Sequence, residues 1–196
     1  IASVPEYDEY LEFHIRPYQD GEFSDWLYRS IAVGDTLKIQ GPLGTCSYDD
    51  SESSKDMLMC ATGTGLAPIY GILQDALRHD HDGRIELVIA AQDVSQLYLI
   101  DELIDLVKCY LNVIVTWVVQ SLDRVIEQCR VAIGASDRLR FIEGDAYQVC
   151  SNYADNLAEK RIFLCGGQGF VTKLRKQLFL NGAKLNNISA DIFLHG

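Results

Sequence analysis

Two glycine-rich turns hold the residues whose types and spacing could bind a phosphorylated ligand. The first, residues 61–68, reads ATGTGLAP, and the second, residues 164–170, reads LCGGQGF. Glycine lets a backbone approach a pyrophosphate closely, and a helix N-terminus offers unpaired N–H groups and the positive end of a dipole. Pro68 suits a first helical turn, where its missing N–H is not needed. The first turn therefore predicts phosphate binding, and a plain strand-to-helix turn is the alternative.

The second turn adds a thiol at the tip of a predicted strand. Gly166, Gly167 and Gly169 leave room for a planar ring to lie against the backbone. Cys165 could contact such a ring instead of filling the core. Taken alone, this stretch is more typical of a tight turn with a core cysteine, so the neighbouring pattern has to decide between the two interpretations.

Both turns follow predicted strands in an alternating pattern of strands and helices. Short, unbroken apolar runs predict strands at 57–61, 85–91, 113–119, 139–142 and 161–165. Apolar residues at helical spacing predict helices at 68–79, 97–107, 122–132, 147–157 and 170–181. This alternation indicates right-handed crossovers and a doubly wound parallel α/β sheet. In such a sheet ligands bind at the carboxyl ends of the strands, where both turns lie.

The first fifty residues follow a different pattern. Alternation at 10–16 and 36–40 predicts two half-buried strands, with a short helix at 23–30 between them and Ser24 as its N-cap. Strands joined by tight turns around one short helix indicate part of an antiparallel barrel. The polar, acidic stretch 47–56 is the predicted linker. We therefore expect a partial barrel domain over residues 1–50 and an α/β domain over residues 51–196.

The overall charge narrows the classes of partner. The 196 residues include 28 acidic and 17 basic side chains, a formal charge of −11. Binding to nucleic acid or to an anionic membrane surface needs a basic surface, so we expect neither partner. The apolar stretches are far shorter than the roughly 18 residues of a membrane span, so we expect no membrane insertion. The chain starts at Ile1 without a methionine and looks like the middle of a longer protein.

The cysteines and histidines do not form a metal-binding pattern. The six cysteines have no C-x-x-C spacing and stand at 46, 60, 109, 129, 150 and 165. We expect them to be reduced, buried side chains of a cytoplasmic protein. His79 and His81 lie at the predicted end of a helix, where an exposed polar position is favoured over a metal site. No metal ligand is predicted.

The order of the motifs resembles the ferredoxin–NADP reductase-like flavoproteins, especially the reductase components of bacterial oxygenases. The resemblance covers nearly all of the chain, and each motif alone is weak. It is carried by Ile1-Ala2-Ser3, Leu11 to Arg16, Gly21-Glu22-Phe23-Ser24, Gly34-Asp35, Gly41-Pro42-Leu43-Gly44, Gly63-Thr64-Gly65 with Pro68, Leu97 to Leu103, Cys165-Gly166-Gly167 and Asp191-Ile192-Phe193.

The resemblance implies a cofactor, an electron relay and a set of site residues. NAD(P)H gives a hydride to FAD, which passes single electrons to an iron–sulfur protein or domain. Around FAD the resemblance places Ser3, His14, Ile15, Arg16, Gly21, Ser24 and Phe193. At the nicotinamide dinucleotide it places Gly63, Thr64, Gly65, Pro68, Gly166 and Gly167, with Cys165 as the catalytic residue at the nicotinamide ring. For Phe193, packing into the core is an equal alternative.

The family's iron–sulfur segment is not found in this sequence. The spacing C-x4-C-x2-C does not occur, so an iron–sulfur cluster is expected outside this chain. The Arg and Tyr-Ser of the family's flavin signature would precede Ile1. A reductase of the pyrimidine-pathway type, which carries a C-terminal cysteine cluster, is disfavoured because no cysteine follows Cys165.

The charge of two strand-end loops predicts which coenzyme is bound. A 2′-phosphate is normally held by Arg or Lys near the adenine ribose. The strand-end loops 92–96 and 120–123 have no basic residue before Arg124, and Asp93 would repel a phosphate. NADH is therefore predicted over NADPH.

The alternative function is a non-catalytic nucleotide-binding subunit or a subunit of an electron-transfer complex.

Overall fold

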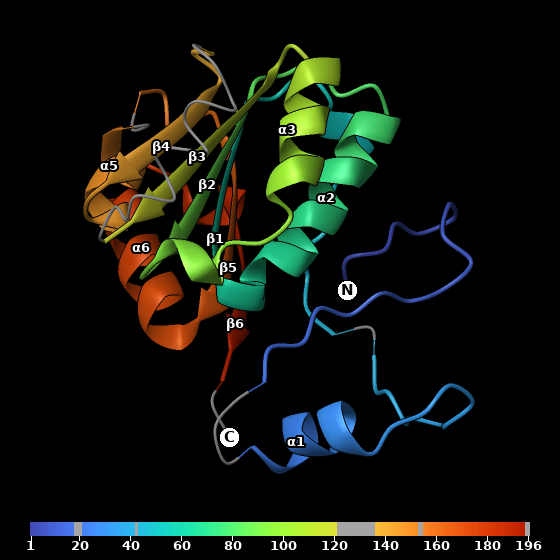
Figure 1. Ribbon diagram of the computed structural model, residues 1–196. Coiled ribbons are helices and arrows are strands. Elements are labelled where there is room, and N and C mark those ends of the chain that lie inside the picture. Colours follow the sequence, from blue (N-terminus) through green and yellow to red (C-terminus); the bar gives the residue numbers. More distant parts are fainter. Residues whose placement is uncertain (18–20, 42, 121–135, 153–154, 195–196) are drawn as a thin grey trace.

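A six-stranded parallel sheet forms the centre of the structure (Figure 1). The computed structural model describes residues 1–17, 21–41, 43–120, 136–152 and 155–194. The strands are β1 (Met57–Thr62), β2 (Ile85–Ala91), β3 (Val113–Val119), β4 (Leu139–Glu143), β5 (Arg161–Gly167) and β6 (Ile188–Phe193). Their spatial order is β4-β3-β2-β1-β5-β6, so the strand order reverses between β1 and β5. A ligand crevice is expected at such a switch point.

Helices cover both faces of this sheet, as Figure 1 shows. Helices α2 (Leu66–Arg78) and α3 (Ile100–Cys109) pack on one face, and α5 (Ala146–Asn152) and α6 (Gln168–Leu180) pack on the other. The doubly wound α/β architecture predicted from the sequence is confirmed. The predicted helix at 122–132 lies outside the described residues.

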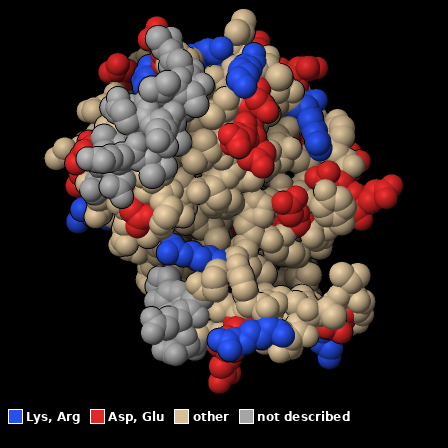
Figure 2. Space-filling model, in the orientation of Figure 1, with Lys and Arg blue, Asp and Glu red and all other residues tan. Residues whose placement is uncertain are grey.

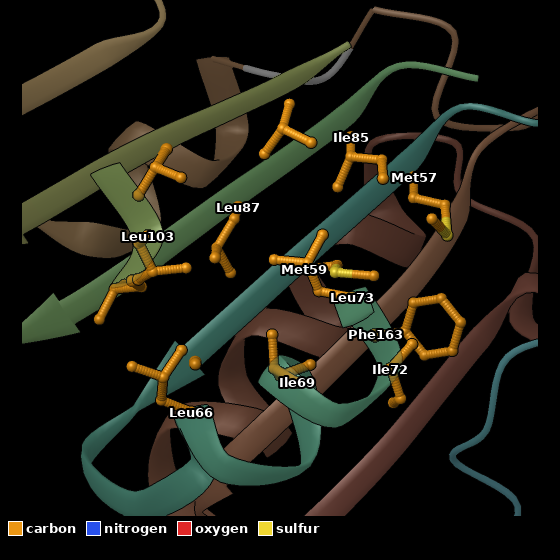
Figure 3. Packing of buried hydrophobic residues seen from close by; sticks show 14 of the residues in the cluster. Met57, Met59, Leu66, Ile69, Ile72, Leu73, Ile85, Leu87, Leu103 and Phe163 are labelled. Atoms are coloured by element: carbon orange, nitrogen blue, oxygen red, sulfur yellow. The ribbon is translucent and has the colours of Figure 1, made fainter. Parts of the chain in front are cut away.

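Alternate side chains of each strand enter two separate cores. Met57, Met59 and Ala61 of β1 face α2, whereas Leu58 and Cys60 face α6. Figure 3 shows the first core, in which side chains of β1, β2 and β5 meet those of α2 and α3. Strands β1, β2 and β3 are mostly apolar because both of their faces are buried.

Strand β6 and the end of α5 were not predicted. Strand β6 pairs with β5 from Ile162↔Ile188 to Gly167↔Phe193, but its short sequence, ISADIF, is too polar to show an apolar run. Helix α5 ends at Asn152 rather than at 157. Asn156 has a φ of 58°, a left-handed conformation that a helix cannot continue through.

The predicted strands at 10–16 and 36–40 are wrong for this structure. Residues 1–17, 21–41 and 43–56 contain helix α1 (Glu22–Arg29) and a 3-10 turn at Asp50–Glu52, but no strand. Alternation stabilises a strand only when a neighbouring strand takes up its backbone hydrogen bonds. Tyr10, Leu11 and Ile39 are exposed in these segments. The antiparallel barrel and the domain boundary at residue 50 stay predictions.

Four local expectations also need correction. Gly21, not Ser24, is the N-cap of α1, and the Ser24 hydroxyl donates to the Gly21 carbonyl over 3.0 Å. Cys109 is exposed and Cys46 is half-buried, because each lies at an element end or in a loop. His81 is buried, since Tyr48 of the preceding segment folds against it, with 3.1 Å between the Tyr48 hydroxyl and His81 Nδ1.

Cys60 and Cys150 are buried free thiols as expected, Cys165 is buried as well, and Cys129 lies outside the described residues. Over the part of the chain that the structure describes, no helix is long and apolar enough to cross a membrane.

Candidate functional site

A cleft of about 1450 Å³ runs along the carboxyl edge of the sheet. Its wall includes Thr62, Ala91, Val118, Gly167 and Phe193 from the ends of five strands, and Gly144 from the turn directly after β4. Helix α1 lies beyond this edge in Figure 1, and the extended segment Ile15 to Pro17 forms part of the cleft wall. The cleft is therefore built where the two parts of the chain meet.

The first glycine turn lies in the cleft at the switch point between β1 and β5. Gly63 and Thr64 line the cleft, and the 3-10 turn Gly63–Gly65 leads directly into α2. Gly65 packs against the backbone of β5, where a Cβ would lie 2.6 Å from the Gly166 nitrogen. Pro68 falls in the first turn of α2 and outside the cleft lining. Glycine is thus required by packing, and the N-terminus of α2 is available to a phosphate.

The second glycine turn contributes backbone to the cleft, whereas its cysteine is turned away. Gly167 lines the cleft, and Gly166 has a φ of 140° and packs against Thr62. The Cys165 side chain is fully buried in the core on the α2 face. It lines neither this cleft nor the adjoining cavity described next. A catalytic role for Cys165 stays a prediction.

A smaller cavity of about 530 Å³ adjoins the cleft. It is lined on one side by His14 to Pro17 and on the other by Gly63, Thr64 and Tyr98. His14 Nδ1 lies 3.1 Å from the Tyr98 hydroxyl, and its Nε2 lies 2.9 Å from a Glu12 carboxylate oxygen. Burial raises the pKa of Tyr98 to about 12, so its hydroxyl stays protonated as a hydrogen-bonding group.

The remaining flavin-side candidates lie away from both cavities. Ser3 is buried, and its hydroxyl accepts a hydrogen bond from the Glu12 N–H over 3.1 Å. Gly21 and Ser24 form the start of α1. The structure therefore brings together His14, Ile15, Arg16, Gly63, Thr64, Gly167 and Phe193, and leaves Ser3, Gly21, Ser24, Gly65, Pro68, Cys165 and Gly166 outside the lining.

Several lining residues were missed by sequence reasoning. Gly144 and Asp145 come from the turn between β4 and α5, Tyr147 comes from the first turn of α5, and the Tyr147 ring lies 5.6 Å from that of Phe170. The signal was present, because a strand was predicted at 139–142 and ligands bind after the carboxyl ends of such strands. Tyr98 was missed as well, since only the fold brings it to His14.

Charge is sparse inside the cleft and mixed outside it. Arg16 is the only basic side chain and Asp145 the only acidic one among the described lining residues. On the face drawn in Figure 2, the Lys and Arg side chains among the described residues are scattered and form no continuous basic patch. A neutral cleft with many glycine and backbone groups suits a ligand bound through N–H donors.

Comparison with known families decides what this architecture belongs to. A family model described as an oxidoreductase NAD-binding domain matches residues 59–176, and one described as an oxidoreductase FAD-binding domain matches residues 1–48. The chain belongs to the oxidoreductase NAD-binding domain family. The resemblance to ferredoxin reductase-like flavoproteins is thereby confirmed, as are FAD and NAD(P)H as the cofactor and coenzyme of the family.

Curated relatives of this oxidoreductase include reductase components of oxygenases. A ferredoxin–NAD(P)+ reductase component of naphthalene 1,2-dioxygenase/salicylate 5-hydroxylase systems from Ralstonia sp is 29% identical over 193 residues. That match covers 98% of this chain and 54% of the relative. The electron transfer component XylA of xylene/toluene monooxygenase from Pseudomonas putida is 35% identical over 103 residues, which are 53% of this chain and 29% of XylA. The chain spans about half the length, or less, of the curated relatives it matches.

Solved structures share the fold of the oxidoreductase. The Amycolatopsis cytochrome P450 reductase GcoB superposes with a TM-score of 0.76 at 21% identity, over 91% of this chain and 50% of that one. The ferredoxin reductase of carbazole 1,9a-dioxygenase superposes with a TM-score of 0.65 at 20% identity, over 92% and 50% of the two chains.

Proposed function

We propose that this oxidoreductase binds NADH in the cleft, passes its hydride to FAD and delivers single electrons to an iron–sulfur acceptor. The observation that carries the proposal is the cleft at the β1/β5 switch point, which has a glycine turn on one side and residues 15–17 of the FAD-binding match on the other. Residues from both matched ranges therefore line one cavity. A hydride donor and a hydride acceptor need that proximity to react.

The turn at residues 62–65 holds the dinucleotide pyrophosphate. Its backbone N–H groups and the N-terminus of α2 provide donors and positive potential, so binding needs no surplus of lysine or arginine in a chain of charge −11. The absence of a Cβ at Gly65 and Gly166 keeps the turn pressed onto β5. This cradle fits the pyrophosphate of a dinucleotide.

The chain's own residues position the two reactants. FAD, when bound, accepts a hydride and releases electrons one at a time, chemistry that no side chain here supplies. Arg16 offers the cleft its one basic group among the described lining residues, and Ile15 offers an apolar surface. His14 is fixed by Tyr98 and Glu12, which anchors the FAD-side segment to the loop before α3.

NADH is preferred over NADPH because of the side chains at one end of the cleft. Gln92, Gln96 and Gln120 line the end formed by β2 and β3, where the adenine ribose belongs. Asp93 lies beside them, and its carboxylate accepts hydrogen bonds from Ser95 and Gln96. No described residue there offers a positive charge to a 2′-phosphate. In calorimetric titrations at matched salt, NADH should bind more tightly; NADPH binding of equal or greater affinity would refute the preference.

An iron–sulfur protein or domain is the proposed electron acceptor. The support is the printed function of the relatives, which are reductase components of oxygenase systems. Within the described ranges, no group of three or more His, Cys, Asp or Glu side chains could hold a metal ion. The acceptor cluster is accordingly proposed to lie outside these residues.

An anaerobic titration tests the proposed function against the alternative of a non-catalytic nucleotide-binding subunit. The purified chain is supplied with FAD, freed of excess flavin and titrated with NADH while the flavin absorbance is followed. We expect the chain to retain FAD and the absorbance to bleach in proportion to the NADH added. NADH binding in calorimetry without bleaching of retained FAD would favour the alternative, and absence of both would refute the nucleotide site.

A further inference from the structure

Two thiols that are 119 positions apart in the sequence meet beside the switch point. Cys46 Sγ lies 3.8 Å from Cys165 Sγ. Cys46 belongs to the FAD-binding match and directly follows the bend at residues 44 and 45, whereas Cys165 lies in β5, two residues before Gly167 of the cleft. The contact therefore joins the two parts of the chain through a pair of reactive side chains.

The two thiols differ in access and in chemistry. Cys46 is half-buried, and Cys165 is fully buried. A hydrogen bond from the Cys165 thiol lowers the pKa of Cys46, while that contact and burial raise the pKa of Cys165. Asp191, opposite Cys165 in β6, opposes ionisation of both, and Arg161 favours ionisation of Cys46. Cys46 is thus the more accessible thiol and the one that ionises more readily, and Cys165 is its buried neighbour.

A second thiol pair in the same chain shows that two sulfur atoms can lie close together without either thiol being exposed. Cys60 of β1 and Cys150 of α5 have their sulfur atoms 3.5 Å apart, and both side chains are fully buried. The pKa of Cys60 is raised well above its usual value by the contact with Cys150 and by burial. Neither side chain of this pair is exposed to solvent, so the pair provides an internal control.

We propose that Cys46 and Cys165 form a redox-active dithiol, which a hydroperoxide converts to a disulfide linking the FAD-side segment to β5. The Cys46 thiolate attacks the hydroperoxide, takes one oxygen to become a sulfenic acid and releases an alcohol, or water from hydrogen peroxide. The Cys165 sulfur then attacks the Cys46 sulfur and expels water. Two thiols lose two electrons and two protons in total, and the hydroperoxide is reduced to the alcohol and water.

Disulfide formation brings the two sulfur atoms from 3.8 Å apart to the about 2.05 Å of the bond. Residues next to Cys46 are exposed, so the segment that carries it can move toward β5. The product ties this segment to the strand that supplies Gly167 to the cleft. The proposal stands on this geometry and does not depend on the proposed function.

Disulfide mapping of the full chain tests the proposal. The reduced protein, with Cys109→Ser and Cys129→Ser to remove other thiols, is treated with hydrogen peroxide, trapped in acid, alkylated and digested. We expect the peptide linked through Cys46 and Cys165 to form at least about tenfold faster than the one linked through Cys60 and Cys150, because oxidation follows exposure and Cys46 is the one of these four side chains that is not fully buried. Dithiothreitol should reverse the link.

Two variants provide matched controls. Cys46→Ser should leave Cys165 reduced under the same treatment, and Cys150→Ala should leave the Cys46–Cys165 link unchanged. The proposal is overturned if Cys46 and Cys165 both remain alkylatable in the unsubstituted pair, if Cys46 is oxidised to the sulfinic acid without a link, or if the Cys60–Cys150 link forms first. Because the mapping of the unsubstituted pair decides the question, a variant that fails to fold does not rescue the proposal.

Discussion

At the scale of single residues, Gly65 is the position where the turn depends most on a missing side chain. A Cβ there would lie 2.5 Å from the Cys165 carbonyl carbon and 2.6 Å from the Gly166 nitrogen, both backbone atoms of a central strand. Gly65→Ala should lower the free energy of unfolding by about 1–3 kcal/mol, the usual cost of overpacking. Denaturant unfolding measures the loss.

Gly169→Ala is the matched control for that substitution. Gly169 lies in α6, and nothing lies within 4 Å of the Cβ that alanine would add. Alanine should therefore be neutral or stabilise the helix by about 0.5–1 kcal/mol. If the two variants changed stability equally, the close packing of the first turn on β5 would be disproved.

His81 should make stability depend on pH. Burial lowers its pKa in the folded chain, so the unfolded chain binds a proton more readily. Its contribution is present above the unfolded pKa of about 6.5 and is lost as the pH falls below it, by at most about 1.4 kcal/mol per pH unit. Urea unfolding of the parent chain and of His81→Gln across this range measures the difference in stability, which should stop changing with pH at high pH.

His79 provides the control with the opposite sign. A hydrogen bond to the Asp75 carbonyl and the Asp75 carboxylate raise the pKa of His79, so its protonation favours the folded chain. His79→Gln should therefore steepen the loss of stability on acidification, whereas His81→Gln should flatten it. Identical pH profiles for the two variants would contradict the burial of His81.

At the scale of elements, the strands that the sequence predicts are those whose two faces are both buried. Residues 85–91 and 113–119 were predicted with the observed bounds, because a mostly apolar run of this length is stable where both of its faces are buried, as in a central strand. Strand β6 escaped prediction because its pairing with β5 decides its conformation. The alternating segments 10–16 and 36–40 were wrong for the converse reason, since no neighbouring strand pairs with them among the described residues.

A buried ion pair also links β2 to the residue directly before β5. Lys160 Nζ lies 2.6 Å from Glu86 Oε2, and the two side chains are only 9% and 5% exposed. Lys160→Met should cost about 3 kcal/mol, because it leaves a buried carboxylate with less compensation, although Arg84 remains 2.9 Å from the other oxygen. Thermal or denaturant unfolding gives the value.

An exposed pair serves as the comparison for that substitution. Lys184 and Glu159 are 3.0 Å apart with side chains that are 58% and 75% exposed. Lys184→Met should therefore cost no more than about 1 kcal/mol. A loss at Lys160 as small as that at Lys184 would show that burial of the Glu86 pair contributes little.

At the scale of the whole molecule, seven of the fourteen residues that the sequence suggested for the site line the cleft or the adjoining cavity. Gly63, Thr64 and Gly167 could be found because strand, turn and helix follow one another along the chain. The contacts of His14 with Tyr98 and of Cys46 with Cys165 join segments 84 and 119 positions apart, which only the folded arrangement reveals. The cleft is a property of the assembled sheet and the segment beside it.

The proposed function depends on hydride transfer from NADH to FAD across that cleft. The direct measurement is anaerobic stopped-flow reduction of the FAD-loaded chain in a single turnover, with NADH and with NADH deuterated at the C4 position. We predict rapid loss of the flavin absorbance with NADH and a slower loss with the deuterated donor. A flavin absorbance that persists with both donors would contradict hydride transfer from NADH to FAD.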